Sequence, residues 1–299
     1  MIAIILVNWK NYDDTKNCLK SLYLSNNTSF NIILIDNESE EKSASKLKES
    51  FPQITILPQE TNLGFTGANN LGIKYGLALG AEYIMLLNND TIVPKNFMTP
   101  LLTTLRSNSQ IAAVQPKIMF ADKPDKIWSG GGIYNSLIAS TTTIGYDQLD
   151  TEKYNKPTYL DWLTGCCILI KAKIISEVGL LNNHFFAYYE DVDWSLRIRK
   201  LGYKLAYNPS VPIYHKAGAS TKTKSKSAEG FLSPFVHFLN IRNHIFLVRL
   251  HAKGFHAINA HIFLLLKISG YGLYFILKGR KKKLKMLLNG FLKGYLTQL

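Results

Sequence analysis

Short aliphatic runs alternate with stretches of helical periodicity over residues 1–115. Each aliphatic run has the length of one buried strand, and the stretches between them repeat apolar residues at helical spacing. A mostly parallel sheet covered by helices on both faces shows this pattern, so the sequence predicts a doubly wound, Rossmann-like α/β fold. The expected strands are 2–7, 32–35, 54–57, 83–87 and 112–114, and the expected helices are 14–24, 43–50, 66–79 and 96–105.

Polar residues directly follow four of the first strands. In open α/β sheets, ligands bind outside the carboxyl ends of the strands, so these residues are the first candidates for a binding site. They are Asn8-Trp9, Asp36-Asn37-Glu38-Ser39, the turn 58–64, and Asn88-Asn89-Asp90.

The rest of the chain divides into three stretches of different character. Between residues 120 and 157 the periodicity weakens, and we expect loops and short strands. Residues 159–215 predict a second ordered block, with strands at 167–170 and 204–207 and a helix that begins at Glu190. A basic polar loop is expected at 222–227, and beyond Phe231 aromatic and aliphatic residues with interspersed Lys and Arg predict a helical extension.

The composition, 46% hydrophobic and 19% charged, is that of an ordered globular protein. The cysteines Cys18, Cys166 and Cys167 are odd in number and lack Cys-x-x-Cys spacing, which favours reduced thiols in a cytoplasmic compartment over disulfides or a zinc site. The apolar run at 1–7 has no basic leader and is too short for a signal peptide, so we interpret it as a buried strand.

The net charge of +14 is concentrated at one end of the chain. Residues 1–215 hold 20 basic and 20 acidic residues, whereas 15 basic residues and a single acid, Glu229, follow His215. The apolar run 258–277 is interrupted by His261 and Lys267, so it predicts amphipathic helices lying on a membrane face. A solvated basic tail packed on the catalytic domain is the alternative, and nucleic-acid binding is disfavoured because no binding module is recognisable.

Two polar segments predict contacts to a nucleotide. Asp36 could accept a hydrogen bond from a pyrimidine imide or from ribose, with Asn37 and Ser39 fixing the loop, although an Asx turn explains the same residues. The segment 62–70 is a glycine-containing turn that opens a helix, where backbone N–H groups are available to phosphate or ribose. It matches neither a Walker A loop nor a dinucleotide fingerprint.

A metal site is predicted at Asp90. The strand before it delivers Asn88, Asn89 and Asp90 to the edge of the sheet, where a carboxylate can hold a divalent cation and amides can bind ribose, water or phosphate. His215, which lies just past the acidic helix and the strand expected at 204–207, could add an imidazole ligand. An ordinary turn before Pro94 and a structural histidine are the alternatives.

A second group of acids, Glu190, Asp191 and Asp193, opens a helix after the aromatic stretch 184–189. Aromatic surroundings raise the proton affinity of a carboxylate, which suits a general base, so Asp191 is the candidate base and Glu190 a candidate for orienting the acceptor. Because Asp193 lies four residues before Arg197, part of the group could serve only helix capping and ion pairing.

Together these segments resemble the inverting family 2 glycosyltransferases of the GT-A fold, particularly the branch of bacterial rhamnosyltransferases and galactofuranosyltransferases. The resemblance covers residues 1–220. It is carried by Val7-Asn8-Trp9, Ile35-Asp36-Asn37-Glu38-Ser39, Asn62-Leu63-Gly64-Phe65 with Ala68-Asn69-Asn70, Leu87-Asn88-Asn89-Asp90, Trp162-Leu163-Thr164-Gly165, Glu190-Asp191-Val192-Asp193 and His215. The family's metal motif is often Asp-x-Asp, whereas Asn88 stands at its first position here, so this motif supplies one carboxylate instead of two.

The resemblance implies a role for each of these motifs. It implies a Mg or Mn ion held by Asp90 and His215, and catalysis by Asp191 with Glu190. The acceptor would meet Trp162, Gly165 and Asp193. The nucleotide would contact Asn8, Asp36, Asn37, Asn62, Phe65, Asn69, Asn88 and Asn89.

We therefore expect a GT-A catalytic domain at 1–220, with a nucleotide-binding half at 1–115 and an acceptor-binding half at 116–220, and a basic amphipathic helical region at 221–299. The expected reaction transfers a sugar, rhamnose first, from a dTDP or UDP donor to a hydroxyl of a glycan or lipid-linked saccharide, with inversion, in cell-surface polysaccharide synthesis. The expected location is the cytoplasmic face of a membrane. The alternatives are a sugar-phosphate nucleotidyltransferase and an inactive, membrane-attached nucleotide-binding protein.

Overall fold

The computed structural model describes the chain except residues 26–28, 39–40, 218–221 and 228. Ser39 and the expected boundary at residue 220 lie outside the described residues. The chain forms two compact units. We call Met1–Ile133, Thr142–Phe186 and Glu190–Ala217 the sheet unit, and Tyr134–Thr141, Ala187–Tyr189 and Gly218–Leu299 the helical unit.

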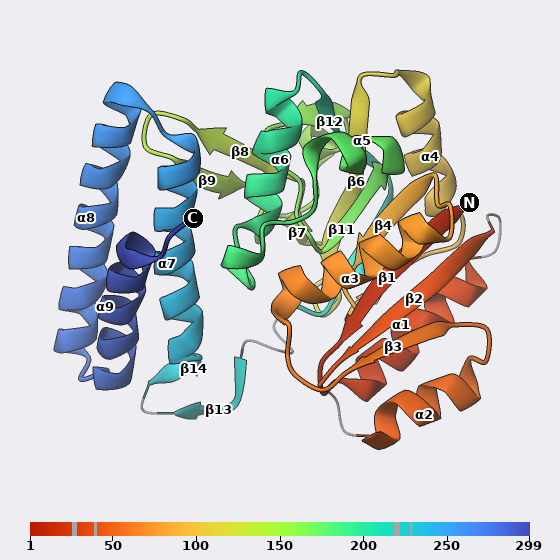
Figure 1. Ribbon diagram of the computed structural model, residues 1–299, viewed down its shortest axis with the longest axis horizontal. Helices are drawn as coiled ribbons and strands as arrows, with labels where there is room; N and C mark the ends of the chain where they lie inside the picture. Colours follow the sequence, from red (N-terminus) through yellow and green to blue (C-terminus); the bar gives the residue numbers. More distant parts are fainter. Residues whose placement is uncertain (26–28, 39–40, 218–221, 228) are drawn as a thin grey trace. The chain divides into compact units, whose positions relative to one another are not determined.

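One mixed, mostly parallel sheet forms the centre of the sheet unit, in the order β10-β12-β6-β11-β4-β1-β2-β3 (Figure 1). Its parallel pairs join β1 to β2 and β4, β2 to β3, and β6 to β12, whereas β11 runs antiparallel to β4 and β6, and β10 antiparallel to β12. The predicted fold class is confirmed. The strands are β1 (Ile2–Asn8), β2 (Phe30–Asn37), β3 (Thr55–Gln59), β4 (Tyr83–Leu87), β5 (Thr91–Ile92), β6 (Ile111–Phe120), β7 (Ile127–Ser129), β10 (Thr158–Leu160), β11 (Cys167–Lys171) and β12 (Lys204–His215).

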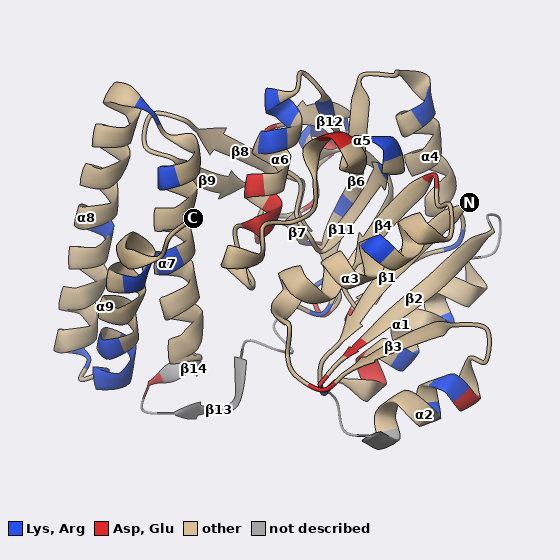
Figure 2. Ribbon diagram, in the orientation of Figure 1, with Lys and Arg blue, Asp and Glu red and all other residues tan. Residues whose placement is uncertain are grey.

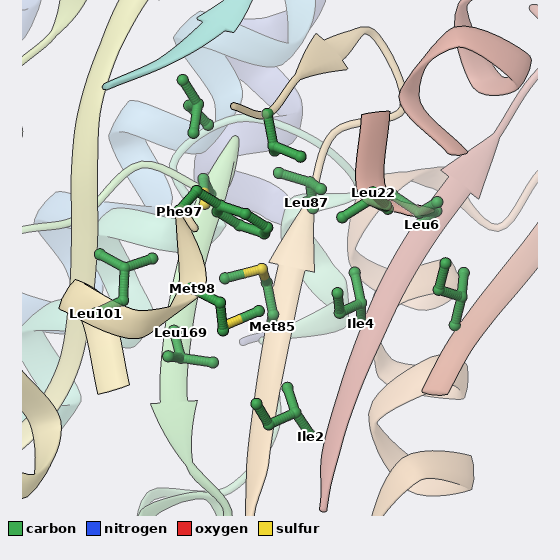
Figure 3. Close-up of a cluster of buried hydrophobic side chains, with 14 of the residues drawn as sticks. Ile2, Ile4, Leu6, Leu22, Met85, Leu87, Phe97, Met98, Leu101 and Leu169 are labelled. Carbon is green, nitrogen blue, oxygen red and sulfur yellow. The ribbon is translucent and has the colours of Figure 1, made fainter. Parts of the chain in front are cut away.

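Helices cover both faces of this sheet, and successive residues of β1 point to opposite sides. Ile2, Ile4 and Leu6 pack with α1 (Tyr12–Leu24), α2 (Glu41–Ser50) and α4 (Met98–Ser107), as Figure 3 shows for part of this core. Ala3 and Ile5 pack on the other side with α3 (Gly64–Ala78), α5 (Ala172–Val178) and α6 (Glu190–Lys200). The central strands read as continuous apolar runs because both faces are buried.

The weakly periodic stretch contains short elements, as predicted: β7, β8 (Gly132–Asn135), β9 (Ser140–Thr143) and a 3-10 turn at Glu152–Tyr154. A second 3-10 turn, Asn183–Phe185, precedes α6. The prediction of a loop at 222–227 was wrong, since Lys222–Ser227 forms β13 and pairs with β14 (Gly230–Leu232). Lys alternates there with Thr or Ser, a period-2 pattern that lacks the apolar side by which strands are recognised.

Three helices, α7 (Pro234–His251), α8 (Gly254–Leu277) and α9 (Lys281–Leu296), build the helical unit. Their core includes Ile241, Ile245, Leu264, Phe275 and Leu287. On α9, a Cβ added at Gly290 would lie 2.7 Å from the Phe238 carbonyl oxygen, so glycine lets α9 approach α7 closely. Glu229, the one acid after His215, accepts from the backbone N–H groups of Lys282 and Lys283 and so caps α9.

Candidate active site

Asn8 and Asp36 come together because they end two neighbouring parallel strands in register. Asn8 Nδ2 donates to Asp36 Oδ1 at 3.0 Å, and both side chains are buried. A buried carboxylate that accepts such a bond is held in one orientation at the sheet edge. The structure thus joins two of the predicted nucleotide contacts into one group.

Thr15 of α1 links this group to Asn89, a connection that the sequence pattern did not predict. Its hydroxyl lies 2.9 Å from Asn8 Oδ1 and 2.8 Å from the Asn11 carbonyl, and Asn89 Nδ2 donates to it at 2.7 Å. Polar side chains at the carboxyl ends of β1, β2 and β4 are therefore connected through one buried hydroxyl. The signal in the sequence is a threonine on a mostly apolar helix face, which is too common to be diagnostic.

Asn37 and Asn62 fix the turn that opens α3. Asn37 Nδ2 donates to Asn62 Oδ1 at 2.9 Å, and the backbone N–H of Leu63 donates to Asn37 Oδ1 at 2.8 Å. Gly64 has a φ of +70°, and a Cβ there would lie 2.5 Å from the Phe186 ring. The turn therefore depends on glycine for both its conformation and its close packing.

Phe65 and Asn69 lie in the first turns of α3. Asn69 is buried, and its Nδ2 donates to the Phe65 carbonyl at 2.8 Å. The Phe65 ring packs at Gly165, where an added Cβ would lie 2.9 Å from its Cζ. The ring of Phe65 thus connects the predicted nucleotide segment with the predicted acceptor segment.

Asp90 and His215 are brought together from positions far apart in the sequence. His215 ends β12, where it pairs with Thr91 of β5, and its Nε2 lies 3.0 Å from Asp90 Oδ1 and 3.4 Å from Asn88 Nδ2. Both side chains are buried, and the Trp128 ring packs edge-on against the imidazole at 4.3 Å. The contact of Asp90 with His215 is close without being a hydrogen bond, since Asp90 Oδ1 has no hydrogen-bond partner among the described residues. His215 Nδ1, the other ring nitrogen, has none there either.

These two side chains fit a divalent cation. A buried carboxylate oxygen without a hydrogen-bond partner faces an imidazole nitrogen, and both are ligands that Mn²⁺ accepts. No group of three or more His, Cys, Asp or Glu residues able to hold a metal occurs in the part of the chain that the structure describes. The protein would therefore supply two ligands, and phosphate oxygens and water would complete the coordination.

Asp191 is held at the start of α6 by backbone donors. Its Oδ2 accepts from the Gly165 N–H at 2.8 Å and its Oδ1 from the Val192 N–H at 2.8 Å. Burial raises the pKa of Asp191, and the two backbone bonds oppose the rise without cancelling it. An oriented carboxylate with elevated proton affinity is suited to accept a proton from a hydroxyl.

Glu190 and Asp193 flank Asp191 and differ in their surroundings. Glu190 is buried, its Oε2 has no hydrogen-bond partner in the described part of the chain, and burial followed by the charge of Asp191 raises its pKa well above the ordinary value. Asp193 forms the ion pair with Arg197 anticipated from their spacing, at 2.9 Å. Arg197 also donates to the carbonyls of Val178 and Leu180, so this pair secures the chain before α6.

The metal and base candidates share one edge of the sheet. The backbone N–H of Asn88 donates to the Cys166 carbonyl at 2.9 Å, next to the Gly165 that binds Asp191. The pKa of the Cys166 thiol is raised well above its ordinary value, first by burial and then by the charges of Asp90 and, more weakly, Asp191. Both carboxylates therefore act on the same short segment.

Trp162 is the first residue of the predicted acceptor segment 162–165. Its indole packs over Gly132, where an added Cβ would lie 1.8 Å from the ring, and its Nε1 donates to the Ile133 carbonyl at 3.2 Å. The side chain is 8% exposed, so only a small part of the ring is available to a ligand.

Several known proteins are similar to this chain. A hexosyltransferase of low-salt glycan biosynthesis from Haloferax volcanii is 27% identical over 205 residues, which cover 67% of this chain and 62% of that protein. An N-acetylglucosaminyl-diphospho-decaprenol L-rhamnosyltransferase from Mycobacterium tuberculosis is 24% identical over 242 residues, covering 74% of this chain and 78% of the relative. The rhamnosyltransferase WbbL of Escherichia coli is 24% identical over 229 residues, or 73% of this chain and 84% of the relative.

Solved structures show the same fold. The crystal structure of GalNAc-T7 with UDP, GalNAc and Mn²⁺ matches with a TM-score of 0.58 and 17% identity over 72% of this chain and 43% of that one. TarS from S. aureus matches with a TM-score of 0.59 and 12% identity over 99% of this chain and 81% of that one. These likenesses confirm the GT-A fold.

A family model described as glycosyl transferase family 2 matches residues 3–179, more than half of the chain. That stretch contains every predicted nucleotide contact and Asp90, together with Trp162 and Gly165. The chain belongs to glycosyl transferase family 2.

Proposed function

We propose that this glycosyltransferase transfers a sugar, with rhamnose as the first candidate, from a dTDP or UDP donor to a hydroxyl of a glycan or lipid-linked saccharide in cell-surface polysaccharide synthesis. The observation that carries the proposal is Asp191, a carboxylate of raised pKa bound to the Gly165 N–H beside the strand end of Asp90. Rhamnosyltransferases among the relatives support rhamnose as the sugar to test first.

The nucleotide would lie in the half of the catalytic domain at 1–115. Asp36, oriented by Asn8, would accept from the base imide or from ribose hydroxyls. The turn fixed by Asn37 and Asn62 would present the start of α3, with the ring of Phe65 beside it. The further contacts proposed for the nucleotide are Asn69, Asn88 and Asn89.

Asp90 and His215 would hold Mg²⁺ or Mn²⁺, which when bound neutralises negative charge on the departing diphosphate. GalNAc-T7 was solved with Mn²⁺, which supports testing this ion first. Since Asn88 brings no charge, the diphosphate itself would complete the ligand set. The proposal therefore predicts that metal and donor bind together more strongly than either binds alone.

Asp191 would take the proton from the acceptor hydroxyl as the hydroxyl oxygen attacks the anomeric carbon from the face opposite the leaving nucleotide. That geometry inverts the anomeric centre. Glu190 would orient the acceptor through its unpartnered Oε2, and Trp162, Gly165 and Asp193 would form the surrounding acceptor segment in the half at 116–220.

We also propose that the helical unit attaches the enzyme to the cytoplasmic face of a membrane. In the part of the chain that the structure describes, one helix, α8, is long and apolar enough to span a bilayer. Lys267 of this helix is bonded to His244 of α7 at 3.1 Å, and an exposed apolar stripe recurs at helical spacing on another face of α8, which favours an interfacial position. The stripe comprises Phe255, Ile258, Ile262, Leu265, Leu266, Leu273, Ile276 and Leu277.

Basic residues near this stripe add attraction for anionic lipid. Figure 2 shows Lys and Arg on all three helices, and Glu229 is the single acid of the helical unit. Each Lys or Arg near an anionic surface contributes about 1 kcal/mol. Sedimentation with phosphatidylglycerol vesicles that weakens as salt rises would support peripheral attachment, whereas resistance to alkaline extraction from cell membranes would indicate a spanning helix.

The decisive experiment measures thermal shift and transfer with a panel of dTDP and UDP sugars, with and without Mn²⁺. We expect one sugar nucleotide to raise the melting temperature more with Mn²⁺ than without it and to be consumed with inversion when a saccharide acceptor is added. A uniform lack of response would count against the proposal. Binding without transfer to any acceptor would favour the inactive binding protein, and family membership leaves the nucleotidyltransferase alternative without support.

A further inference from the structure

The short segment 163–165, which ends at Gly165, takes its backbone hydrogen bonds from side chains. Residues 163 and 164 lie outside helices and strands, so no ladder of backbone bonds serves their N–H groups. Three successive N–H groups each donate to one side chain of the sheet unit. The three bonds join Leu163 to Ser195 Oγ at 3.1 Å, Thr164 to Gln115 Oε1 at 2.9 Å, and Gly165 to Asp191 Oδ2 at 2.8 Å.

These three side chains come from two elements. Asp191 and Ser195 are four residues apart on α6, so they lie on the same face of that helix. Gln115 comes from β6, which lies between β11 and β12 in the sheet, and its backbone pairs with Tyr207 of β12. Gln115 therefore ties the segment to the interior of the sheet, independently of α6.

A fully buried glutamine is a costly choice at this position of β6. The residues before it, Ile111–Val114, are apolar and buried, and burying an amide is unfavourable unless its polar atoms are hydrogen-bonded. Its Nε2 reaches only the Pro116 carbonyl, at a long 3.4 Å, so the short bond to Thr164 is the main one that the amide makes. An apolar side chain would avoid the cost of burial but would leave the Thr164 N–H without its acceptor.

We propose that Gln115 is a positioning residue for transfer: by holding the Thr164 N–H, it fixes Gly165, whose N–H in turn restrains Asp191. This role rests on the proposed role of Asp191 as the base. Without the bond from β6, the segment would keep its two side-chain bonds to α6 and lose the one that ties it to the sheet. Asp191 would then be held less firmly relative to the strand ends where the donor would lie.

The test compares Gln115→Met with a matched control on the same strand, Lys117→Met. Methionine has nearly the length of glutamine and removes the acceptor for Thr164. Lys117 lies two residues further along β6 and is also buried, but its ammonium binds Asp150, at 2.7 Å, and Asn155, both outside the segment. We expect Gln115→Met to lower kcat by about 10²-fold, the effect of a small misplacement of a reacting group.

Two further readouts separate positioning from general damage. Donor KM should remain within about twofold of wild type. The acidic limb of the kcat profile should move to higher pH, because the Gly165 N–H stabilises the charged form of Asp191 and a weaker bond raises the pKa of this carboxyl. Lys117→Met should unfold at lower urea concentration, since it breaks a buried ion pair, and should keep the wild-type kcat and acidic limb.

The shift of the acidic limb would come from the lost restraint, because glutamine and methionine are both uncharged. The substitution leaves in place the charged and titratable groups around Asp191, which are Glu190, Asp193 with its partner Arg197, and the Cys166 thiol. Gln115→Leu removes the same acceptor with a different apolar shape and serves as a second variant. Wild-type kcat or an unmoved acidic limb in Gln115→Met would overturn the proposal, and so would an equal loss of donor binding and turnover or failure of both variants to fold.

Asp191→Asn in the same assay distinguishes the positioning role from the proposed base. If Asp191→Asn is inactive while Gln115→Met is fully active, the positioning role alone is rejected. If Asp191→Asn remains active, the assignment of the base fails, and the role of Gln115 fails with it.

Discussion

Two polar groups at the edge of the same sheet are built in opposite ways. In the first, Asp36, Asn8, Thr15 and Asn89 are joined by successive hydrogen bonds of 2.7 to 3.0 Å. In the second, buried atoms of Asp90, His215 and Glu190 have no hydrogen-bond partner within the described ranges. The members of the first group are bonded to one another, whereas the second group leaves buried polar atoms to be matched from outside.

This difference distinguishes residues that hold the site in shape from residues that bind ligands or react. A buried polar group without a partner costs about 1–3 kcal/mol, so a fold that keeps several of them has a reason other than stability. A cation, a diphosphate and an acceptor hydroxyl could each satisfy one of the unmatched atoms. We therefore expect substitutions of Asp191, the neighbour of Glu190, and of the second group to affect turnover most, and substitutions in the first group to affect stability most.

The largest loss should follow Asp191→Asn. The change keeps the shape of the side chain and removes its ability to take a proton, so kcat should fall by about 10²–10⁴-fold while donor affinity stays within about twofold. Steady-state transfer and donor titration check both parts. Near-wild-type turnover would remove Asp191 from the mechanism.

Asp90→Ala should have the next largest effect, lowering kcat/KM by about 10²-fold through loss of charge stabilisation. Mn²⁺ should then no longer strengthen donor binding, which isothermal titration with and without the ion can measure. Asp14→Ala is a matched control, because that carboxylate pairs with Lys216, the neighbour of His215, without joining the unmatched group. An unchanged Mn²⁺ dependence in Asp90→Ala would contradict the assignment.

Glu190→Gln should lower turnover but stabilise the fold. The raised pKa of Glu190 means that the folded state disfavours the charged form. The folded state then binds more protons than the unfolded state once the pH exceeds the ordinary glutamate pKa, about 4.3, and stability falls as the pH rises through this window. The variant should melt at a higher temperature than wild type at pH 7 and show a smaller difference near pH 4, and an equal shift at both pH values would contradict this origin.

The smallest effect on turnover is expected for Thr15→Val, which replaces the bridging hydroxyl with a methyl group. Asn8 and Asn89 then lose a buried partner, so the free energy of unfolding should fall by about 1–3 kcal/mol. Urea unfolding measures the loss, and kcat should change by less than about threefold. A large loss of kcat with unchanged stability would show that the first group takes part in the chemistry.

The grouping of polar residues at the strand ends could be predicted from the sequence, because the carboxyl ends of neighbouring parallel strands lie at the same edge of the sheet. Asn8 and Asp36 needed only the register of β1 and β2 to come into contact. The strand expected at 112–114 continues to Phe120 in the structure. Gln115 and Lys117 interrupt the apolar pattern, which is why the predicted strand ended early, yet both side chains are buried. Their partners, the Thr164 N–H and Asp150, lie far along the chain, and periodicity contains no information about them.

The hydrogen bonds of Thr15 and of Asn243, a buried residue of α7, could not be predicted for a related reason. Each is a common polar residue within a helix, and its importance comes from groups that tertiary structure brings to it. Asn243 Nδ2 donates to the carbonyls of Tyr188 and Ala187, 55 and 56 residues earlier in the chain. A backbone carbonyl carries no side-chain identity, so no residue pattern marks such a partner.

The interleaving of the two units has a consequence for synthesis on the ribosome. Tyr134–Thr141 and Ala187–Tyr189 emerge long before α7, whose residues complete the unit to which they belong. At about 5–20 residues per second, the segment Ala187–Tyr189 waits several seconds for the helices of its own unit. The strands of the sheet unit, which end at His215, would thus be synthesised before the helical unit can be completed, so the two units would fold in a fixed order on the ribosome.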